Sequence, residues 1–418
     1  MMSYIIEGGR KIEGETYVSG SKNAALPIIA ACILNGRTTK LYNVPDIHDT
    51  KIMFEILRNL GCKIKRNSGK IVIDSKNINK YEIPENLMRQ MRSSVVIAGA
   101  LIGRLKKARF SYPGGCDIGA RPIDLHLKAF RELGINIQED AGNILCSCEN
   151  VIANKIQLDF PSVGATENAM LAAVYAKGET TIVNAAMEPE IVDLQNFLNR
   201  MGAKIKGAGT KEIKVEGVCS LKDVSYKIMP DRIEAGTLLC AAAITGGSIK
   251  LKNVIPDHLA TVLGKLEDVG CKIYISDKKI YLVAPKKLKA VDIKTTAYPG
   301  FPTDMQSIFS TILCVAKGTS IITENIFENR YKYTQELVRM GAKITIEGRT
   351  AIINGVKKIN GKNVYATDLR GGAALILAGL AARGRTKVEN VEYILRGYEN
   401  IDEKLRMLGA RITLKEGD

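Results

Sequence analysis

The chain has 418 residues, more than one ordinary hydrophobic core accommodates, so we expect two or three domains. Its hydrophobic fraction of 46% and charged fraction of 25% are those of a soluble globular protein, and no apolar run reaches the roughly 20 residues of a membrane span. The formal charge of +16 favours an anionic substrate over nucleic acid, because tryptophan is absent and aromatic residues make up only 6% of the chain.

Cysteine and histidine usage argues against a metal enzyme. The nine cysteines are scattered and odd in number, and the N-terminus lacks the apolar stretch of a signal peptide, which predicts free thiols in a reducing cytoplasm. Cys146 and Cys148 form a C-x-C pair, but two thiols do not make a zinc site. With only three histidines, scattered along the chain, we expect a cytoplasmic protein without a metal or another cofactor.

Residues 2–9 and 13–20 read as two strands that precede the first alanine-rich helix, and they could complete either domain. Six copies of one motif then follow along the chain: LRNLGCKI, FRELGINI, LNRMGAKI, LEDVGCKI, LVRMGAKI and LRMLGARI. Their glycines lie at 61, 134, 202, 270, 341 and 409, so successive copies are 68 to 73 residues apart. Each copy reads as the end of an amphipathic helix, a glycine C-cap and a short strand.

An alanine-rich apolar stretch that ends in glycine lies upstream of each copy and reads as a buried helix followed by a strand. Each repeat is therefore predicted to run helix–strand–helix–strand–strand. Six such units predict an α/β protein of two domains with three pseudo-symmetric repeats each, helices packed inside and sheets outside. We place the first domain at 22–229 and the second at 1–21 with 230–418. Two crossings between domains would create a cleft in which ligands are expected.

The second repeat is longer than the others. From the glycine that ends the inner helix to the motif glycine there are 31 residues in this copy (103–134) and 23 to 25 in the other five. The added segment is YPGGCDIGARP (112–122), in which glycine and proline predict a loop. A lone cysteine is usually a small buried hydrophobe, but an insertion in one repeat often serves function, so Cys116 becomes a candidate site residue.

Several basic residues occupy glycine-rich turns at predicted helix starts. Lys22 lies in SGSKN, Arg121 follows the cysteine loop, Arg370 lies in LRGG and Arg396 opens RGYE. A helix N-terminus with a nearby cation binds anions, and arginine grips phosphate or carboxylate with two hydrogen bonds. The alternatives are an N-cap for SGSK and ordinary surface arginines.

Asp304, in FPTDMQ, opens the inner helix of the fifth repeat. An aspartate there is commonly a helix cap, but it could also accept a proton from an attacking hydroxyl.

The motifs taken together resemble the UDP-N-acetylglucosamine 1-carboxyvinyltransferases of the enolpyruvyl transferase family. The resemblance runs in order from about residue 3 to 412 and rests on SGSKNAALP, YPGGCDIGARPIDLH, FPSVGATENAM, YPGFPTDMQS, FENRY, TDLRGG and RGYENIDEKL. It implies a two-domain inside-out α/β barrel. It also implies transfer of the enolpyruvyl group of phosphoenolpyruvate to the sugar 3′-hydroxyl with release of phosphate. This would be the first committed step of peptidoglycan precursor synthesis, and hence of cell wall biogenesis, cell shape and division.

The same resemblance implies the roles of individual residues. Cys116 would be the general acid and the target of the antibiotic fosfomycin, and Asp304 the base. Phosphoenolpyruvate would contact Lys22, Asn23, Arg121 and Arg396, of which Lys22 and Arg396 would also be catalytic. Arg330 and Arg370 would add positive potential. The nucleotide sugar would lie against Arg92, Pro122, Ile123, Asp124, Leu125, Ser162, Val163, Gly164 and Ile326 as well as Arg121 and Asp304. Some relatives carry lysine where this chain has Phe160, which puts one diphosphate contact in doubt.

Two other functions stay open. The first is 5-enolpyruvylshikimate-3-phosphate synthase, which shares the implied fold and mechanism but not the GGCDIGARPIDLH and FPSVGAT pattern. The second is a repeat-built nucleic-acid-binding protein, suggested only by the charge and the symmetry. The leading interpretation predicts small-molecule substrates, no nucleic acid and no membrane insertion, and it leaves the oligomeric state open.

Overall fold

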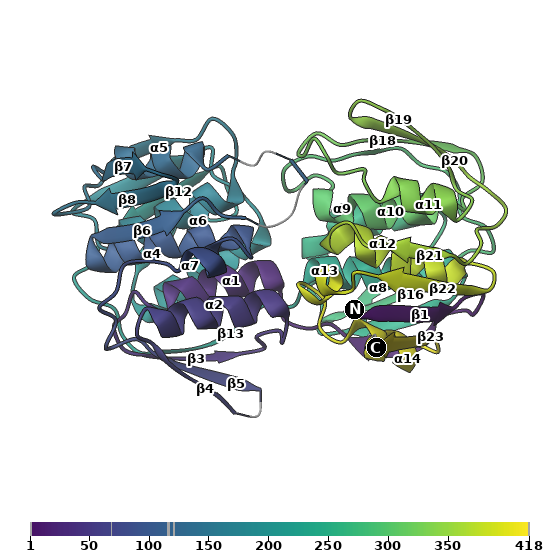
Figure 1. Cartoon of the computed structure of the whole chain (residues 1–418), viewed down its shortest axis with the longest axis horizontal. Helices are drawn as coiled ribbons and strands as arrows, with labels where there is room; N and C mark the ends of the chain where they lie inside the picture. The colour runs from purple at the N-terminus through teal and green to yellow at the C-terminus, as the bar shows by residue number, and fades with distance from the viewer. Residues whose placement is uncertain (1, 68, 115–117, 120–121, 417–418) are drawn as a thin grey trace. The chain divides into compact units, whose positions relative to one another are not determined.

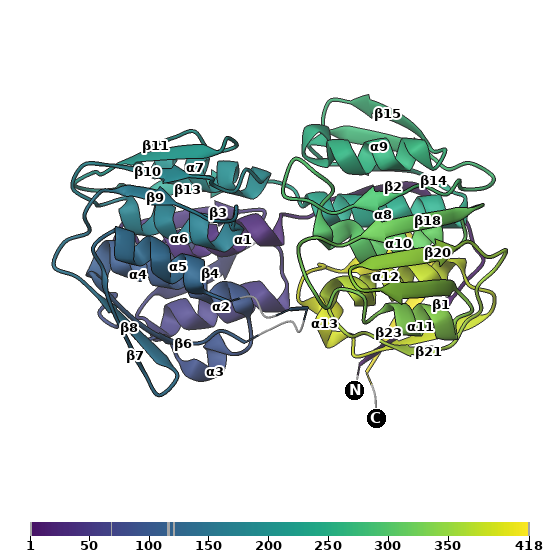
Figure 2. The same cartoon turned by 90° about the horizontal axis from the view of Figure 1, so that it is seen from above.

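The computed structural model describes residues 2–67, 69–114, 118–119 and 122–416 (Figures 1 and 2). Contacts divide them into two compact units. Unit 1 contains residues 2–19, 118–119 and 230–416, and unit 2 contains residues 20–114 and 122–229. The chain begins in unit 1, enters unit 2 after Ser19 and returns after Met229. The predicted fold class, a mixed α/β protein of two three-repeat units, is confirmed.

Unit 2 has three inner helices, which are buried along almost their whole length, and three outer helices that complete the repeats. The inner helices are α1 (Lys22–Ala31), α4 (Val96–Leu105) and α6 (Val163–Ala173). The outer helices are α2 (His48–Asn59), α5 (Asp124–Glu132) and α7 (Pro189–Met201), and the short helices are α3 (Glu85–Met88) and η1 (Arg92–Val95).

Three sheets surround the inner helices of unit 2. The first has the order β13 (Val224–Lys227), β3 (Thr38–Tyr42), β5 (Lys70–Asp74), β4 (Lys63–Asn67). The second has β6 (Lys107–Ser111), β8 (Asn143–Ser147), β7 (Asn136–Asp140). The third has β9 (Lys155–Gln157), β10 (Glu179–Val183), β12 (Glu212–Glu216), β11 (Lys204–Lys206). Strands such as β5 and β12 alternate buried and more exposed residues, so one face of each sheet covers the helices.

Unit 1 repeats this plan around the inner helices α8 (Arg232–Thr245), α10 (Gln306–Leu313) and α12 (Leu369–Ala381), which lie in its middle in both views (Figures 1 and 2). Its outer helices are α9 (Ala260–Asp268), α11 (Thr334–Arg339) and α14 (Ile401–Met407). Its short helices are η2 (Pro256–Leu259), η3 (Thr303–Met305) and α13 (Glu392–Leu395).

Three four-stranded sheets surround the helices of unit 1. The first has the order β2 (Glu13–Tyr17), β14 (Ser248–Lys252), β16 (Lys279–Val283), β15 (Lys272–Ser276). The second has β17 (Ile293–Lys294), β18 (Thr319–Thr323), β20 (Thr350–Asn354), β19 (Lys343–Glu347). The third has β21 (Asn363–Tyr365), β22 (Arg385–Glu389), β1 (Ser3–Glu7), β23 (Arg411–Lys415). The two N-terminal strands therefore both complete unit 1. Among the described residues no helix combines the length and apolar character needed to cross a bilayer.

The inner helices of unit 2 run parallel, as the contacts between their C-terminal ends show. Arg104, at the end of α4, donates to the carbonyl of Ile33 after α1 at 2.7 Å, and the Tyr175 hydroxyl, after α6, donates to the Leu34 carbonyl at 2.8 Å. Their N-terminal ends consequently gather at the opposite end of the unit. Close contact between the helices needs small residues: a Cβ on Gly99 in α4 would lie 2.6 Å from the Asn168 carbonyl oxygen in α6.

All six motif glycines have positive φ, between 74° and 111°, as predicted for helix C-caps. The corresponding expectation, that a glycine ends each inner helix, holds directly only for α8, whose C-cap is Gly246. Helices α1, α6, α10 and α12 end three to five residues before their glycines, and the second repeat departs in the opposite sense. Helix α4 continues past Gly103 to Leu105, and Lys106 takes the left-handed conformation with φ 61°. Gly103 is small for another reason, since its Cβ would lie 2.7 Å from the Leu171 carbonyl oxygen. The interval from Lys106 to the motif glycine Gly134 is still longer than the corresponding interval in the other repeats, but by less than the interval from Gly103 predicted.

Two glycines of unit 1 provide a test of the capping prediction. We expect Gly409→Ala to lower the free energy of unfolding by about 1–2 kcal/mol, because its φ is 89° and the nearest atom to a new Cβ is 3.9 Å away. Gly264→Ala, inside α9 with nothing within 4 Å of the new Cβ, should raise it by roughly 0.5–1 kcal/mol. Urea unfolding followed by circular dichroism measures both, and shifts in the same direction would contradict the assignment.

Candidate active site

The predicted site residues of unit 2 cluster at the N-terminal ends of its helices. Lys22 is the first residue of α1, where the Ser21 hydroxyl accepts a hydrogen bond from the Ala24 amide at 3.3 Å. The segment therefore caps the helix and also places a cation at its positive end. Asn23 follows directly. Three helix N-termini with a nearby lysine form a setting that favours an anion.

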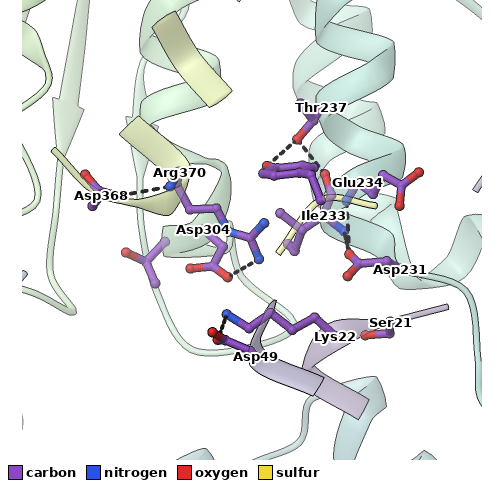
Figure 3. Close-up of polar contacts among 12 residues, drawn as sticks. Ser21, Lys22, Asp49, Asp231, Ile233, Glu234, Thr237, Asp304, Asp368 and Arg370 are labelled. Atoms are coloured by element: carbon purple, nitrogen blue, oxygen red, sulfur yellow. Dashed lines mark hydrogen bonds and ion pairs between the residues drawn. The ribbon is translucent and has the colours of Figure 1, made fainter. Parts of the chain in front are cut away.

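Lys22 is paired with a carboxylate that sequence reasoning missed. Its Nζ lies 2.7 Å from Oδ2 of Asp49, in the first turn of α2 (Figure 3). The Asp49 side chain is only 1% exposed and that of Lys22 11%, so water screens the pair weakly. An aspartate in a first helical turn looks like an ordinary partner of the helix dipole, and nothing in the sequence joins it to Lys22.

Arg92 and the start of α5 come together. Arg92, in η1, donates from Nη2 to the carbonyl of Pro122 at 2.9 Å, and Ile123 is buried at the N-cap of α5. Asp124 is exposed and Leu125 is half-buried in the first turn. The structure thus brings together five of the residues predicted to face the nucleotide sugar.

Ser162, Val163 and Gly164 form the start of α6, where the Ser162 hydroxyl accepts from the Ala165 amide at 3.3 Å. A Cβ on Gly164 would lie 2.9 Å from the ring of His126, so a glycine is required there by packing. His126 in turn lies 2.7 Å from the amide of Asn168, whose oxygen accepts from the Gly99 amide at 2.8 Å. This buried network, which the sequence did not predict, fixes α4, α5 and α6 together. Phe160 is 46% exposed.

Glu167 lies one turn after Ser162 and is buried. Burial, and then the negative charges of Glu190 and Glu188, raise the pKa of Glu167 well above its ordinary value. Sequence reasoning missed this group, because its burial results from the packing of α6 inside the unit.

In unit 1 the predicted base is held between two predicted arginines. Asp304, in η3, accepts from Arg330 at 2.7 Å through Oδ1 and from Arg370 at 2.9 Å through Oδ2. Both guanidiniums are almost completely buried, and 27% of the Asp304 side chain is exposed. Asp304 therefore orients both arginines and is more than a helix cap. Arg330 also donates to the Thr303 carbonyl at 3.3 Å.

Arg370 combines burial with unused donors. It is the second residue of α12, where Asp368 accepts from the backbone amides of Arg370 and Gly371 at 3.0 Å (Figure 3). Among the described residues no acceptor satisfies its Nε or Nη1. Its guanidinium lies 5.2 Å from the centre of the Tyr398 ring. Burial acts to lower the pKa of Arg370, but Asp304 and then Tyr398 and Asp231 outweigh it and raise the pKa, so the side chain stays charged.

The remaining predicted residues of unit 1 lie in loops. Arg396 is the C-cap of α13, and Ile326 is half-buried after β18, with its amide donating to Glu324 at 2.8 Å. Cys116 and Arg121 lie outside the described residues. Near them in the sequence, the Ile118 carbonyl accepts from the Asn329 amide at 3.0 Å within unit 1.

The described residues offer no group of three or more histidine, cysteine, aspartate or glutamate side chains placed to hold a metal ion. The chemistry visible in the two units is that of fixed cations, helix N-termini and one carboxylate that has two guanidinium partners. Side chains and helix ends of these kinds favour anions in each unit.

Comparison with known proteins gives one consistent result. Residues 6–405 match the family described as EPSP synthase (3-phosphoshikimate 1-carboxyvinyltransferase). The chain is 53% identical, over 99% of both chains, to UDP-N-acetylglucosamine 1-carboxyvinyltransferase 2 of Caldanaerobacter subterraneus subsp. tengcongensis. It is 48% identical, again over 99% of both, to UDP-N-acetylglucosamine 1-carboxyvinyltransferase of Geotalea uraniireducens.

Solved structures agree on the fold. The enolpyruvyl transferase NikO from Streptomyces tendae matches with a TM-score of 0.90 and 25% identity, over 100% of this chain and 99% of that one. EPSP synthase from Acinetobacter baumannii matches over 100% of both chains with a TM-score of 0.76 and 18% identity, which supports the fold alone.

The buried Glu167 generates a pH-dependent prediction. A carboxyl whose pKa is raised in the folded state stabilises the fold below its unfolded value, here 4.5, and this contribution is lost as the pH rises through the folded-state pKa. We therefore expect the wild-type chain to lose more unfolding free energy between pH 5 and pH 8 than Glu167→Gln, measured by urea unfolding. Equal losses in the two proteins would show that ionisation of Glu167 does not lower the free energy of unfolding.

Proposed function

We propose a function for this chain on the premise of its family: it belongs to the EPSP synthase family of enolpyruvyl transferases, at about 50% identity to full-length UDP-N-acetylglucosamine 1-carboxyvinyltransferases. It transfers the enolpyruvyl group of phosphoenolpyruvate to the 3′-hydroxyl of UDP-N-acetylglucosamine and releases phosphate. The observation that carries the proposal is the buried guanidinium of Arg370, which has donors without acceptors beside Asp304. Unsatisfied buried donors are costly unless a ligand completes them.

Phosphoenolpyruvate carries a phosphate and a carboxylate, so its pocket needs several fixed cations. Lys22, Arg121 and Arg396, with Asn23, bind it in this proposal, and Arg330 and Arg370 add positive potential. The pairing of Lys22 with Asp49 supports this role, because the carboxylate holds the ammonium in place while the site is empty. The nucleotide sugar is bound by Arg92, Pro122–Leu125, Ser162–Gly164 and Ile326.

The reaction is an addition followed by an elimination. Asp304 accepts the proton of the 3′-hydroxyl as its oxygen attacks C2 of phosphoenolpyruvate, and Cys116 protonates the C3 methylene. The resulting tetrahedral adduct loses phosphate, and loss of a C3 proton restores the double bond. The neighbouring guanidiniums stabilise the charge that develops on the substrate. Each Asp304 oxygen accepts from one arginine and keeps a second lone pair that can accept the proton of the hydroxyl.

The product class makes this a peptidoglycan precursor enzyme that acts in the cytoplasm and contributes to cell wall synthesis, cell shape and division. The eight described cysteines, all free thiols, support a reducing compartment.

A phosphate-release assay tests the function. We expect release from phosphoenolpyruvate with UDP-N-acetylglucosamine and none with shikimate 3-phosphate, the acceptor of the alternative enzyme. The reverse preference would overturn the proposal in favour of that synthase. Salt-sensitive retention on DNA without turnover would favour a nucleic-acid-binding protein.

Replacement of Asp304 separates turnover from binding. We expect Asp304→Asn, which keeps the shape between the two arginines, to lower kcat by roughly 100- to 10,000-fold with little change in the affinity for UDP-N-acetylglucosamine. The control is Asp268→Asn, which removes a surface carboxylate 3.0 Å from Lys265. Near-normal turnover of Asp304→Asn would reduce Asp304 to a structural partner of the arginines.

Cys116 is tested by substitution and by labelling. By the family resemblance, we expect Cys116→Asp to stay active and resist fosfomycin, and Cys116→Ser to be nearly inactive because a hydroxyl is too weak an acid. Mass spectrometry should find the fosfomycin adduct on Cys116 alone. Burial raises the pKa of Cys146 and Cys314 to about 12, which keeps these thiols protonated, and exposed Cys219 is the internal control. An adduct elsewhere would contradict the assignment.

A further inference from the structure

Glu324 is a fully buried carboxylate that the proposed reaction does not use. It follows β18 in the fifth repeat and directly precedes the loop 325–330, which carries Ile326 and Arg330. The amide of Glu324 donates to the Arg349 carbonyl at 2.8 Å, so its backbone is fixed to the hairpin of the same sheet. A carboxylate is rarely buried completely unless it has strong partners.

The two oxygens of Glu324 bind two different segments. Oε1 accepts from the amides of Ile326 at 2.8 Å and Phe327 at 3.1 Å, and Oε2 accepts from the Thr303 hydroxyl at 2.9 Å. Thr303 is the neighbour of Asp304 in η3. One side chain therefore connects the segment that carries the base with the loop that carries Ile326 and Arg330.

Four of the other repeats carry an asparagine at the corresponding place, and Glu389, the one carboxylate that precedes such an asparagine, pairs with Lys387 at 3.0 Å. The residues before these asparagines are Tyr42, Val183, Lys252 and Glu389, and the asparagines have φ of 56° or 57°, a left-handed conformation that Asn325 does not adopt. Those four asparagines donate to carbonyls at the end of the adjacent parallel segment, Ile228, Leu158, Val18 and Ala366. Asn325 makes the equivalent bond to the Thr295 carbonyl at 3.0 Å. The asparagine thus makes the bond to the adjacent segment that the repeats share, and the hydrogen bonds of Glu324 are additional to that bond.

The loop that Glu324 holds also receives the described part of the cysteine loop. The Asn329 amide donates to the Ile118 carbonyl at 3.0 Å, and a Cβ on Gly119 would lie 2.3 Å from the carboxylate of Glu328. Gly119 has φ 152°, so both its backbone and its lack of a side chain suit this approach. The position of loop 325–330 therefore bears on Asp304, on Arg330 and on the segment that follows Cys116.

We propose that Glu324 is a positioning residue for enolpyruvyl transfer, fixing the loop 325–330 against the segment that carries Asp304. It does so through hydrogen bonds and without touching substrate. The negative charge of Glu324 also favours the buried guanidinium of Arg330, in addition to the effect of Asp304. The expected changes in kcat and KM rest on the proposed function, whereas the expected changes in hydrogen exchange rest on the contacts alone.

Three variants test the bonds separately. Glu324→Ala removes them all, and we expect kcat to fall by roughly 10- to 100-fold with a higher KM for UDP-N-acetylglucosamine. Glu324→Gln keeps a carbonyl for the two amides and offers an NH2 group to the Thr303 oxygen, so it should restore kcat to within about threefold of wild type. Thr303→Val cuts only the link to Asp304 and should lower kcat with little change in that KM.

The matched control is Thr319→Val, which removes a threonine hydroxyl bonded to Asn354 at 2.8 Å in the same sheet, on an exposed surface. It should leave kcat and KM unchanged. Wild-type kcat in both Glu324→Ala and Thr303→Val would overturn the proposal, as would a Glu324→Gln variant that folds but is as slow as Glu324→Ala. If Glu324→Ala does not fold, Glu324→Gln and Thr303→Val still decide between these outcomes.

Hydrogen exchange gives a readout that does not depend on the reaction. The Ile326 and Phe327 amides should exchange at least tenfold faster in Glu324→Ala than in wild type, and at nearly wild-type rates in Glu324→Gln and Thr319→Val. Unchanged exchange in Glu324→Ala would overturn the positioning role. Absence of phosphate release by the wild-type chain would instead overturn the proposed function, so the two failures are distinguishable.

Discussion

The parallel packing of the inner helices is the constraint on which the rest of the structure depends. It is seen in unit 2 at Arg104 and Tyr175, and in unit 1 where Arg370 at the start of α12 contacts Asp304 just before α10. It requires small residues where backbones meet, as at Gly99 and Gly103, and it brings three helix N-termini to one end of the unit. Those ends present unsatisfied amides and positive potential. The chain places Lys22 and Ser162 at such ends in unit 2 and Arg370 in unit 1, so the positions of these side chains in each unit follow from the same packing that forms its core.

Fixed cations at these ends create an electrostatic difficulty, because a buried guanidinium or ammonium without a partner is costly. The protein resolves it with carboxylates: Asp49 for Lys22, and Asp304 for both Arg330 and Arg370. The compensation of Arg370 is incomplete, since two of its nitrogens lack an acceptor among the described residues. An anionic ligand would meet cations that are already oriented and only partly neutralised, and little reorganisation would then accompany binding.

Local features were predictable from the sequence, and long-range pairings were not. The motif glycines, the repeat order and the helix start at Ser21 are set by neighbouring residues, and the structure bears them out. Gly103 was misread because a glycine serves a helix end and a close helix contact equally well. The partners of the site, such as Asp49, Asn168 and Glu324, come from other repeats or other elements, and no spacing in one sequence reveals which side chains the fold brings together. The roles of the individual site residues stay predictions.

The strand β1 lies between β22 and β23 in the last sheet, since residues 3–7 pair with both of them. Strand β2 likewise pairs with β14, more than two hundred residues later in the chain. During synthesis on the ribosome these first strands therefore emerge long before any of their partners. Residues 20–114 and 122–229, by contrast, contain all the strands of their own three sheets. The topology thus imposes an order of assembly: the inserted unit can close before the rest of the chain is made, whereas the unit that contains β1 and β2 is completed only after β23 has been synthesised.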